Sequence, residues 1–438
     1  MISRLTESII YIGANDHDID LFEGHFEVPL GMSYNSYVVL DDKTVIFDTI
    51  DKSKTEEWLG NIEEALDGRS PDYLVIQHME PDHSASLEAF VNKYPKVRLI
   101  GSNRAFKMAV QFFPELDISS RIEVNDGDTL NTGKHTFTFV SAPMVHWPEV
   151  IMTYESSEKI LFSADGFGKF GALDVVDEEG WACEARRYYF GIIGKYGAQV
   201  QTVLKKISGY DISMICPLHG PVLDEDIDYY ITTYDTWSSY EPEDRGVAIF
   251  YTSVYGNTKK AVELLADELR SLGEDTVEVI DLAREDMYES VEDAFRYDRI
   301  VLATTTYNGD IFPFMKEFTR HLAERNYQNR TVGMIENGSW APNAIRTMKK
   351  ELSECRNITY TDSNVTIFSA LSERSINEIK ALAKELSETK PPAANYEPQE
   401  TKKWVCQVCG HVVEADSLPD DFQCPLCKVG KDNFKEIK

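Results

Sequence analysis

A six-residue run, HMEPDH at residues 78–83, combines four side chains of the metal-ligand type. It contains two imidazoles, His78 and His83, and two carboxylates, Glu80 and Asp82. A mixed set of nitrogen and oxygen ligands suits iron, manganese or zinc better than copper(I) or calcium. The run therefore predicts a metal site, although a polar loop with a capping aspartate and two surface histidines would contain the same residue types.

A strand and a helix have to position this run. The segment before it, residues 73–77, is apolar enough for a buried strand. Because side chains alternate between the two faces of an extended chain, His78, Glu80 and Asp82 would leave that strand on one face. We expect His83 to open a helix, so that the ligands stand at the mouth of the strand.

Three further candidate ligands, His146, Asp165 and His219, each follow an apolar, strand-like run. Ligands spread over successive strand ends are what a layered β scaffold brings to a site at its rim. Seven ligands are too many for one ion, but they fit two ions that share a bridging carboxylate. Asp165 is the natural bridge.

This pattern resembles the metallo-β-lactamase fold and, more narrowly, the flavo-diiron proteins. Hydrolases of that fold usually carry a histidine where Glu80 stands. A carboxylate in place of an imidazole adds negative charge and hardens the site, which favours iron over zinc. The resemblance implies one iron held by His78, Glu80 and His146, a second held by Asp82, His83 and His219, and a bridge at Asp165.

The same resemblance extends to residues outside the ligand set. It implies that Tyr196 lines the substrate pocket. Many relatives also have a histidine directly before the glycine that corresponds to Gly24, whereas this chain has Glu23 there and His25 one residue beyond Gly24. The sequence leaves open whether Glu23, His25 or neither of them supports the metal ligands.

A second kind of site begins after an apolar run at residues 247–251, which has the composition of a buried parallel strand. A hydroxyl-rich turn, residues 252–258, follows and leads into a helix that we expect at residues 259–272. The turn offers backbone N–H groups, a helix N-terminus and hydroxyls, with no carboxylate to repel an anion, and therefore predicts a phosphate site. It resembles the flavodoxin phosphate loop and lacks both the Walker lysine and the glycines of a dinucleotide fingerprint. An ordinary Ser/Thr-rich loop would look similar.

Two later strand ends support a flavin. Strand-like runs at residues 300–303 and 331–335 lead into loops that carry Tyr307 and Trp340 beside glycines. Open α/β sheets bind ligands at such ends, and the two rings could flank a flavin, although packing is the commoner role of such rings. The order of the three loops resembles flavodoxins and implies FMN. The expected FMN-binding residues are Thr252, Ser253, Val254, Tyr255, Gly256, Asn257, Thr258, Thr305, Thr306, Tyr307, Asn308, Gly309, Asn337, Gly338, Ser339 and Trp340.

The third site is formed by paired Cys-x-x-Cys knuckles near the C-terminus, with the thiols Cys406, Cys409, Cys424 and Cys427. Paired knuckles place four thiolates tetrahedrally about one ion, either iron or zinc. The aromatic surroundings resemble rubredoxin and imply a redox iron. The short segment between the knuckles resembles the compact rubredoxin domains of rubrerythrin-type proteins, and a structural zinc ribbon stays an alternative.

Length and charge agree with a multidomain α/β chain of 438 residues with a formal net charge of −30. Such an acidic chain is a poor partner for nucleic acids and for anionic membrane surfaces. The sequence shows neither a signal peptide nor a membrane-spanning run, so a cytoplasmic location is expected. The expected parts are a metallo-β-lactamase-like αββα domain at 1–244, a flavodoxin-like doubly wound domain at 245–388, a linker at 389–401 and a small rubredoxin-like domain with the four-cysteine site at 402–438.

Taken together, the chain resembles a flavorubredoxin. That resemblance implies an oxidoreductase that reduces O2 to water, NO to nitrous oxide, or both. Electrons would enter the iron of the four-cysteine centre from a separate NAD(P)H-dependent reductase or a rubredoxin, and pass through FMN to two irons. No nicotinamide fingerprint follows a strand in this chain. The family also implies a head-to-tail homodimer or a dimer of such dimers.

Two other classes of function use part of the same residues. A dizinc hydrolase would use the seven ligands to activate water, but it needs neither a flavin nor a rubredoxin-like domain. A pure electron carrier would need the flavodoxin-like and cysteine domains, but not the seven ligands at the rim.

Overall fold

The computed structural model describes residues 2–389, 403–406, 412–414, 418–419, 422–423 and 429–437. It divides between residues 393 and 394 into two compact units, which are described separately. Within the described residues, no helix combines the length and the apolar character needed to span a membrane.

The first unit begins with two sheets that pack face to face. Phe47 of one sheet stacks on Phe162 of the other, with ring centroids 4.0 Å apart. The seven-stranded sheet has the order β1 (Ser3–Arg4), β2 (Ile9–Tyr11), β7 (Tyr37–Val39), β8 (Val45–Phe47), β9 (Tyr73–Ile76), β10 (Arg98–Gly101) and β11 (Ile122–Glu123). The five-stranded sheet has the order β12 (Thr129–Asn131), β13 (Thr136–Ser141), β14 (Ile151–Glu155), β15 (Ile160–Phe162) and β16 (Met214–Cys216). Two short pairs, β3 (Ala14–Asp16) with β6 (Met32–Tyr34) and β4 (Leu21–Phe22) with β5 (Phe26–Glu27), lie beside them.

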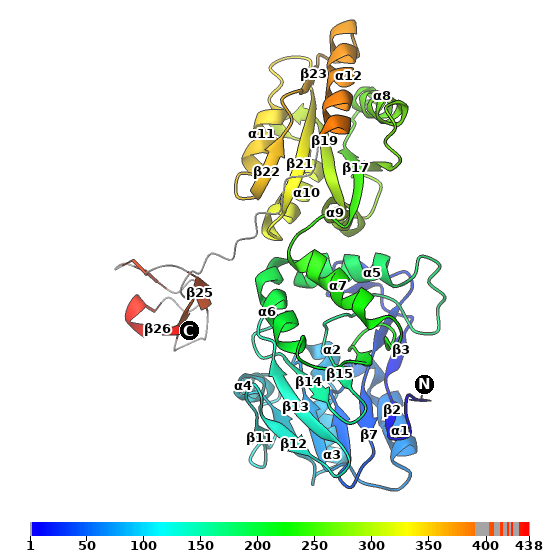
Figure 1. Ribbon diagram of the computed structural model, residues 1–438, viewed down its shortest axis with the longest axis vertical. Coiled ribbons are helices and arrows are strands. Elements are labelled where there is room, and N and C mark those ends of the chain that lie inside the picture. Colours follow the sequence, from blue (N-terminus) through cyan, green and yellow to red (C-terminus); the bar gives the residue numbers. More distant parts are fainter. Residues whose placement is uncertain are drawn as a thin grey trace. The chain divides into compact units, whose positions relative to one another are not determined.

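Helices cover the outer faces of this sandwich (Figure 1). Along β8, Phe47 belongs to the core between the sheets, whereas its neighbour Ile46 belongs to the core beneath the helices. This alternation is the period of a strand buried on both faces. The helices are α1 (Thr55–Leu66), α2 (Pro81–Ser84), α3 (Leu87–Lys93), α4 (Asn103–Phe112), α5 (Trp181–Tyr188), α6 (Gly197–Ile207) and α7 (Ile227–Ser238). A 3-10 turn, η1 (Lys52–Lys54), precedes α1, and a π-helical turn, η2 (Tyr189–Ile193), and a 3-10 turn, η3 (Gly194–Tyr196), join α5 to α6. This is the expected αββα arrangement.

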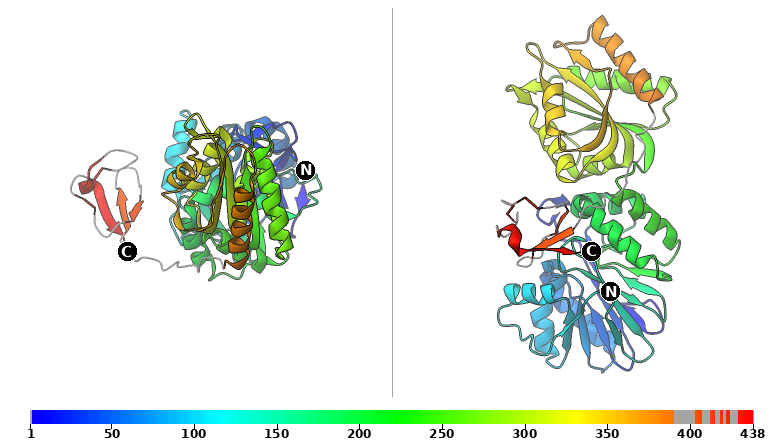
Figure 2. Two further views of the ribbon diagram at one scale, coloured as in Figure 1. Left: turned by 90° about the horizontal axis from the view of Figure 1, so that it is seen from above. Right: turned by 60° about the vertical axis from the view of Figure 1, so that its left-hand side comes forward.

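The rest of the first unit is a doubly wound domain. Its parallel sheet has the order β18 (Val277–Asp281), β17 (Asp244–Tyr251), β19 (Tyr297–Tyr307), β21 (Gln328–Asn337) and β22 (Arg356–Tyr360), with β20 (Asp310–Ile311) paired to β19 and β23 (Val365–Ile367) paired to β21. Helices α8 (Asn257–Ser271) and α12 (Glu373–Glu388) pack on one face, and α9 (Met287–Arg296), α10 (Pro313–Glu324) and α11 (Ala344–Glu351) pack on the other. Figure 2 gives two further views of this sheet with α12 in orange against it.

These two domains meet at the amino-terminal ends of the flavodoxin-like strands. Tyr240 accepts hydrogen bonds through its carbonyl oxygen from Arg330 (2.8 Å) and Asn329 (3.3 Å) at the start of β21. Arg186 of α5 donates to Glu292 of α9 at 3.0 Å, and both side chains are buried. The contact therefore uses the edge of the sheet opposite to the loops that follow the strands.

The second unit contains a three-stranded antiparallel sheet in the order β25 (Val412–Glu414), β24 (Lys403–Cys406) and β26 (Phe434–Ile437), with a short 3-10 turn, η4 (Lys431–Asn433), before β26. Buried Cys406 packs in one cluster with Leu418 and Phe434, and Phe422 meets Phe434 edge to face. The aromatic surroundings expected for Cys406 are thus present. Cys409, Cys424 and Cys427, and the linker from residue 390, lie outside the described residues.

Candidate metal centre and flavin site

All seven candidate ligands stand just beyond strand ends at one rim of the sandwich. His78 follows β9, His146 lies between β13 and β14, and Asp165 and His219 follow β15 and β16. Glu80, Asp82 and His83 come from the N-terminus of α2. This helix begins at Pro81, two residues earlier than expected, because proline is favoured in the first helical turn.

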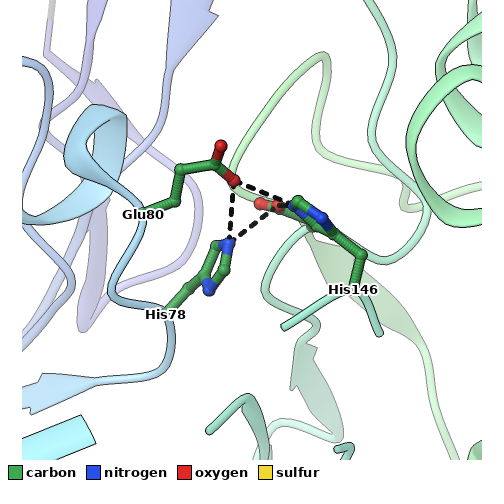
Figure 3. A group of neighbouring side chains, drawn as sticks. His78, Glu80 and His146 are labelled. Atoms are coloured by element: carbon green, nitrogen blue, oxygen red, sulfur yellow. Dashed lines mark hydrogen bonds and ion pairs between the residues drawn. The ribbon is translucent and has the colours of Figure 1, made fainter. Parts of the chain in front are cut away.

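Four of these side chains form a first group: His78, Glu80, His146 and Asp165. Glu80 Oε2 lies 3.2 Å from His78 Nε2 and 2.9 Å from His146 Nε2 (Figure 3). Asp165 Oδ2 lies 3.3 Å from His78 Nε2 and 3.2 Å from His146 Nε2. The donor atoms thus surround one point.

Asp82, His83 and His219 form a second group. The Nε2 atoms of His83 and His219 are 3.0 Å apart, and Asp82 Oδ2 lies 3.2 and 3.1 Å from them. The other oxygen of Asp165, Oδ1, lies 3.1 Å from His83 Nε2. Asp165 therefore presents one oxygen to each group, which is the arrangement of a bridging carboxylate.

The donor set fits two metal ions. Both carboxylate oxygens of Asp82 are buried without a hydrogen-bond partner among the described residues. Buried polar atoms are normally hydrogen-bonded, so atoms that converge without partners indicate an ion between them. Nitrogen and oxygen donors at this ratio suit iron.

Hydrogen bonds outside the ligand set fix which ring nitrogen faces the ions. His78 Nδ1 donates to Glu149 Oε1 at 2.8 Å, and His219 Nδ1 donates to the Ser33 carbonyl oxygen at 2.7 Å. Both rings are thereby held with Nε2 toward the centre. Glu149 also accepts from the Met79 backbone N–H at 2.9 Å. Sequence analysis missed Glu149 and Ser33, since neither belongs to a motif of ligand type.

The electrostatics of the ligands reflect this crowding. Burial alone would raise the pKa of Asp165, but the charges of His78 and His83 and hydrogen bonds from His146 and His83 hold it well below its usual range. Burial lowers the pKa of His146, and hydrogen bonds to Asp165 and Glu80 outweigh burial and raise it to about 9. A cation is strongly favoured between these carboxylates.

Glu23 and His25 point to different neighbours. The pKa of Glu23 is raised to about 8, first by burial and then by the charge of Glu80. Glu23 also shares a hydrogen bond with Glu80. The His25 ring stacks on Tyr288 of α9, with centroids 5.3 Å apart, and its Nε2 lies 3.9 Å from Glu23 Oε2. Of the two residues that the sequence left open, Glu23 is the one beside a metal ligand.

Two tyrosines, Tyr188 and Tyr196, are candidates for the residue that lines the substrate pocket. Tyr188, which sequence analysis missed, is fully buried, its ring centroid lies 5.6 Å from that of His219, and its hydroxyl has no hydrogen-bond partner among the described residues. Burial and the charges of Asp165, Asp82 and Glu80 raise its pKa. Tyr196 lies in η3, where burial alone raises its pKa. Its assignment to the pocket stays a prediction, whereas Tyr188 lies beside a ligand.

The three loops expected to bind FMN follow β17, β19 and β21, which are neighbours in the parallel sheet. In the first loop, Ser253 Oγ accepts from the backbone N–H groups of Gly256 (3.1 Å) and Lys259 (3.3 Å). The hydroxyl proton of Ser253 is therefore available to an anion at the start of α8. That helix begins at Asn257, two residues before the expected position.

The FMN loops also offer an unpartnered hydroxyl and two exposed aromatic rings. Asn337 Nδ2 donates to the Ser369 carbonyl oxygen at 3.2 Å, and the buried Thr305 hydroxyl has no hydrogen-bond partner in the described part of the chain. Tyr255 and Trp340 are 91% and 82% exposed. Exposed aromatic rings, in loops that also offer an unpartnered hydroxyl, fit a site that a flat, polar ligand covers.

Family models match three parts of the chain. The ODP family β-lactamase model matches residues 32–220, the flavodoxin domain model matches residues 248–364, and the rubrerythrin rubredoxin-like domain model matches residues 404–435. The boundaries at 244, 388 and 401 stay predictions.

Relatives and solved structures share this combination. The chain is 26% identical over the full length of both chains to the anaerobic nitric oxide reductase flavorubredoxin of Aliivibrio fischeri. It is similar to rubredoxin oxygen:oxidoreductase from Desulfovibrio gigas, with a TM-score of 0.82, 24% identity and coverage of 88% of this chain and 98% of that chain. A flavo di-iron protein variant from Thermotoga maritima gives a TM-score of 0.78 at 26% identity, covering 88% of this chain and 98% of that chain.

These matches agree with the sites described above. A flavodoxin domain holds FMN, a flavo-diiron core holds two irons, and a rubredoxin-like domain holds one iron. The converging ligands and the open loops fit the first two of these cofactors. The chain is an oxidoreductase that combines, over its full length, the β-lactamase-like and flavodoxin domains of the flavo-diiron proteins with the rubredoxin-like domain of the flavorubredoxins that it resembles.

Proposed function

We propose that this protein reduces a diatomic gas at the two-metal centre, NO to nitrous oxide and O2 to water. The observation that carries the proposal is Asp165, which offers one carboxylate oxygen to each ligand group. Asp165 and the two ligand groups would hold two irons side by side, and this pair would supply electrons for reduction of a gas molecule. The full-length relatives named nitric oxide reductases support NO, and the similar fold of an oxygen oxidoreductase supports O2.

The surrounding side chains exclude water and hold the ligands. Phe22 meets the His219 ring edge to face at 5.4 Å, and buried Tyr34 lies at 6.1 Å from it. With Tyr188 they form an aromatic wall beside the second ligand group. Such a wall keeps competing water away from a small, neutral substrate, and the Tyr188 hydroxyl is a hydrogen-bond donor without a partner among the described residues.

The proposed route for electrons begins at the rubredoxin-like domain. A separate NAD(P)H-dependent reductase or a rubredoxin delivers electrons to the iron of Cys406, Cys409, Cys424 and Cys427. They pass to FMN and then to the two irons. A cytoplasmic location is part of this proposal, supported by the free thiols of Cys183, Cys216 and Cys355.

The proposed assembly is a head-to-tail homodimer or a dimer of such dimers. The amino-terminal edge of the flavodoxin-like sheet contacts the metal domain of the same chain, whereas the FMN loops lie at the carboxyl edge. Strand β19 has 11 residues, so the two edges are separated by about 30 Å. A second subunit that places its metal centre at the carboxyl edge would shorten the electron path.

The test is anaerobic mixing of the fully reduced, full-length protein with NO and, separately, with O2. Rapid reoxidation of FMN and iron with nitrous oxide or water as product supports the proposal. Two equivalents of zinc in place of iron, with ester or amide hydrolysis, would overturn it.

The electron route is tested with a chain truncated before Pro391. It should keep full activity with an artificial donor that reduces FMN directly and lose the reductase-driven rate. Cys406→Ser in the full chain should behave in the same way and lose ferric-thiolate absorption. A truncated chain that accepts electrons from the reductase at the full rate contradicts the route.

A further inference from the structure

A chain of tyrosine and tryptophan rings starts at the metal centre. Two residues after the bridging Asp165, the Phe167 backbone N–H donates to Tyr234 Oη at 2.7 Å. The carbonyl oxygen of the same residue accepts from the Trp181 indole Nε1 at 3.3 Å. Both rings are therefore linked through one hydrogen bond and a few covalent bonds to the bridging carboxylate.

The rings continue from there to the surface. Trp181 stacks on Trp237 with centroids 5.6 Å apart and an interplanar angle of 10°. Trp181 also meets Tyr230 edge to face at 4.8 Å, and Tyr230 meets Tyr229 at 5.2 Å. Tyr229 is 44% exposed. Adjacent rings are in contact all the way from the Phe167 peptide to solvent.

The far end opens on a surface cavity of about 450 Å³, lined by Tyr229 and Glu243 among others. Glu243 Oε2 accepts the Trp237 indole N–H at 2.7 Å and is itself paired with Arg186, so the Trp237 ring is fixed by an ion-paired carboxylate. A cavity of this size admits a small reductant directly onto the exposed Tyr229 ring.

Packing alone would not require these residue types. A core of the same volume can be filled with phenylalanine and leucine, whereas Tyr and Trp each bring a polar atom that has to be satisfied. Tyr and Trp are also the aromatic side chains that lose an electron most easily. Five of them, in unbroken contact between a metal-bridging segment and solvent, form a path for one-electron steps.

We propose that Tyr234, Trp181, Trp237, Tyr230 and Tyr229 supply electrons to the metal centre when it meets O2 without reduced FMN. This relay rests on the proposed gas reduction. Reduction of O2 to two waters consumes four electrons and four protons, of which two electrons come from a ferrous pair. The other two come from two side chains, each of which loses one electron and one proton, while solvent supplies the remaining two protons. The two resulting radicals reach Tyr229 one after the other, where two one-electron equivalents from a small reductant such as ascorbate or a thiol restore both rings.

The relay predicts a difference between the two gases. Reduction of two NO molecules to nitrous oxide and water consumes only two electrons, which a ferrous pair supplies in full. Only O2 should therefore draw electrons from the aromatic rings.

The test uses the iron- and FMN-loaded full chain, reduced until the irons are ferrous while FMN absorbance shows the oxidised flavin. The sample is mixed with O2, freeze-quenched and measured by electron paramagnetic resonance. A tyrosine-type radical is expected in the native chain, and its loss is expected in the Trp181→Phe Trp237→Phe variant. Mass spectrometry after repeated exposure should find oxidised Tyr229 in the native chain only.

Controls separate the relay from folding and from the gas reaction. Trp58→Phe removes a fully buried tryptophan that packs on Phe90, outside the chain of rings, and should keep the radical. Tyr229→Phe, a mild change at an exposed site, should move the radical off this position even if the tryptophan variant does not fold.

Each outcome decides one point. Irons that stay ferrous after mixing with O2 overturn the gas reduction and the relay together. Irons that oxidise without a protein radical, or with the same radical in the tryptophan and Tyr229 variants, overturn the relay alone. An equal radical yield with NO also contradicts it.

Discussion

The rim of the sandwich that carries the seven metal ligands (the metal rim) and the edge of the parallel sheet that carries the three FMN loops (the flavin rim) are built in opposite ways. Both lie at the ends of strands, but five of the seven metal ligands are buried, and five are either oriented by a second hydrogen bond or placed at the short helix α2. The FMN loops expose their largest rings, Tyr255 at 91% and Trp340 at 82%. A charged ligand set has to be held in place before the ion arrives, because its members repel one another, whereas a flat cofactor can itself complete an open site.

The largest effect is expected at the bridge. Asp165→Ala removes the only carboxylate that faces both ligand groups among the described residues, so iron content should fall sharply and gas reduction should be abolished. The FMN spectrum should be unchanged, because the flavin rim is independent of this residue. Iron analysis and stopped-flow mixing check the prediction. Asp174→Ala, at an exposed carboxylate, is the control, and undiminished turnover in Asp165→Ala would refute the two-iron assignment.

At the flavin rim, the affinity for FMN should fall when side-chain hydroxyl donors are removed. In Ser253→Ala Thr258→Ala, each lost hydrogen bond to a phosphate dianion costs about 1.5–3 kcal/mol, so FMN should bind roughly a hundredfold more weakly or worse. Flavin fluorescence titration measures this, and iron content should stay constant. Ser271→Ala, at the other end of α8, is the matched control. Unchanged FMN affinity would place the phosphate elsewhere.

A smaller effect is expected from the support of His78. Glu149→Gln keeps the shape of the side chain but weakens its hydrogen bond to His78 Nδ1, found at 2.8 Å. Loss of such a partner lowers metal affinity by roughly 10–100-fold. Iron release to a chelator should accelerate while FMN affinity stays the same. Equal iron retention in the variant and the native chain would show that the metal rim does not depend on this support.

The smallest effect concerns the joint between the two domains. Burial and the charge of Arg325 lower the pKa of His321 from 6.5 to about 4, while Arg325 Nη1 donates to His321 Nδ1 at 3.0 Å. The unfolded chain therefore binds this proton more readily, so stability is lost as the pH falls from 6.5 to 4.

In His321→Gln, the midpoint temperature of unfolding should depend less on pH within that window. Thermal unfolding at several pH values measures it. His17→Gln, which removes a surface histidine paired with Asp174, separates this effect from the loss of any histidine. A slope that is the same in His321→Gln and the native chain would contradict the prediction.

Sequence reasoning reached the ligands because their types are rare near strand ends and their order along the chain is simple. It did not reach Glu149, whose partner His78 is 71 residues away, since only folding brings the two together. The pocket tyrosine shows a second limit. Helix α5 ends at Tyr188 and continues as the π-helical turn η2. A π turn adds a residue per turn and rotates the side chains that follow, so helical spacing does not indicate which tyrosine faces the ligands.

The expected helix starts were wrong by two residues at both α2 and α8, where proline and a glycine turn decide the start. The arrangement of the layers was predictable, because alternating and continuous apolar runs report burial on one or two faces of a strand. The choice between Glu23 and His25 was not predictable, because it depends on Tyr288. This residue comes from α9, far along the chain, and the His25 ring stacks on it.

The two edges of the flavodoxin-like sheet have a consequence for mixed populations of subunits. In the proposed head-to-tail pair, each flavin would serve the metals of the other subunit, so the electron path would belong to the pair. A subunit without iron and a subunit without FMN would then complement each other, with one working path in each mixed pair. Dilution to single subunits would silence chains that carry every cofactor. Catalytic output would therefore rise more steeply than the protein concentration where pairs begin to form.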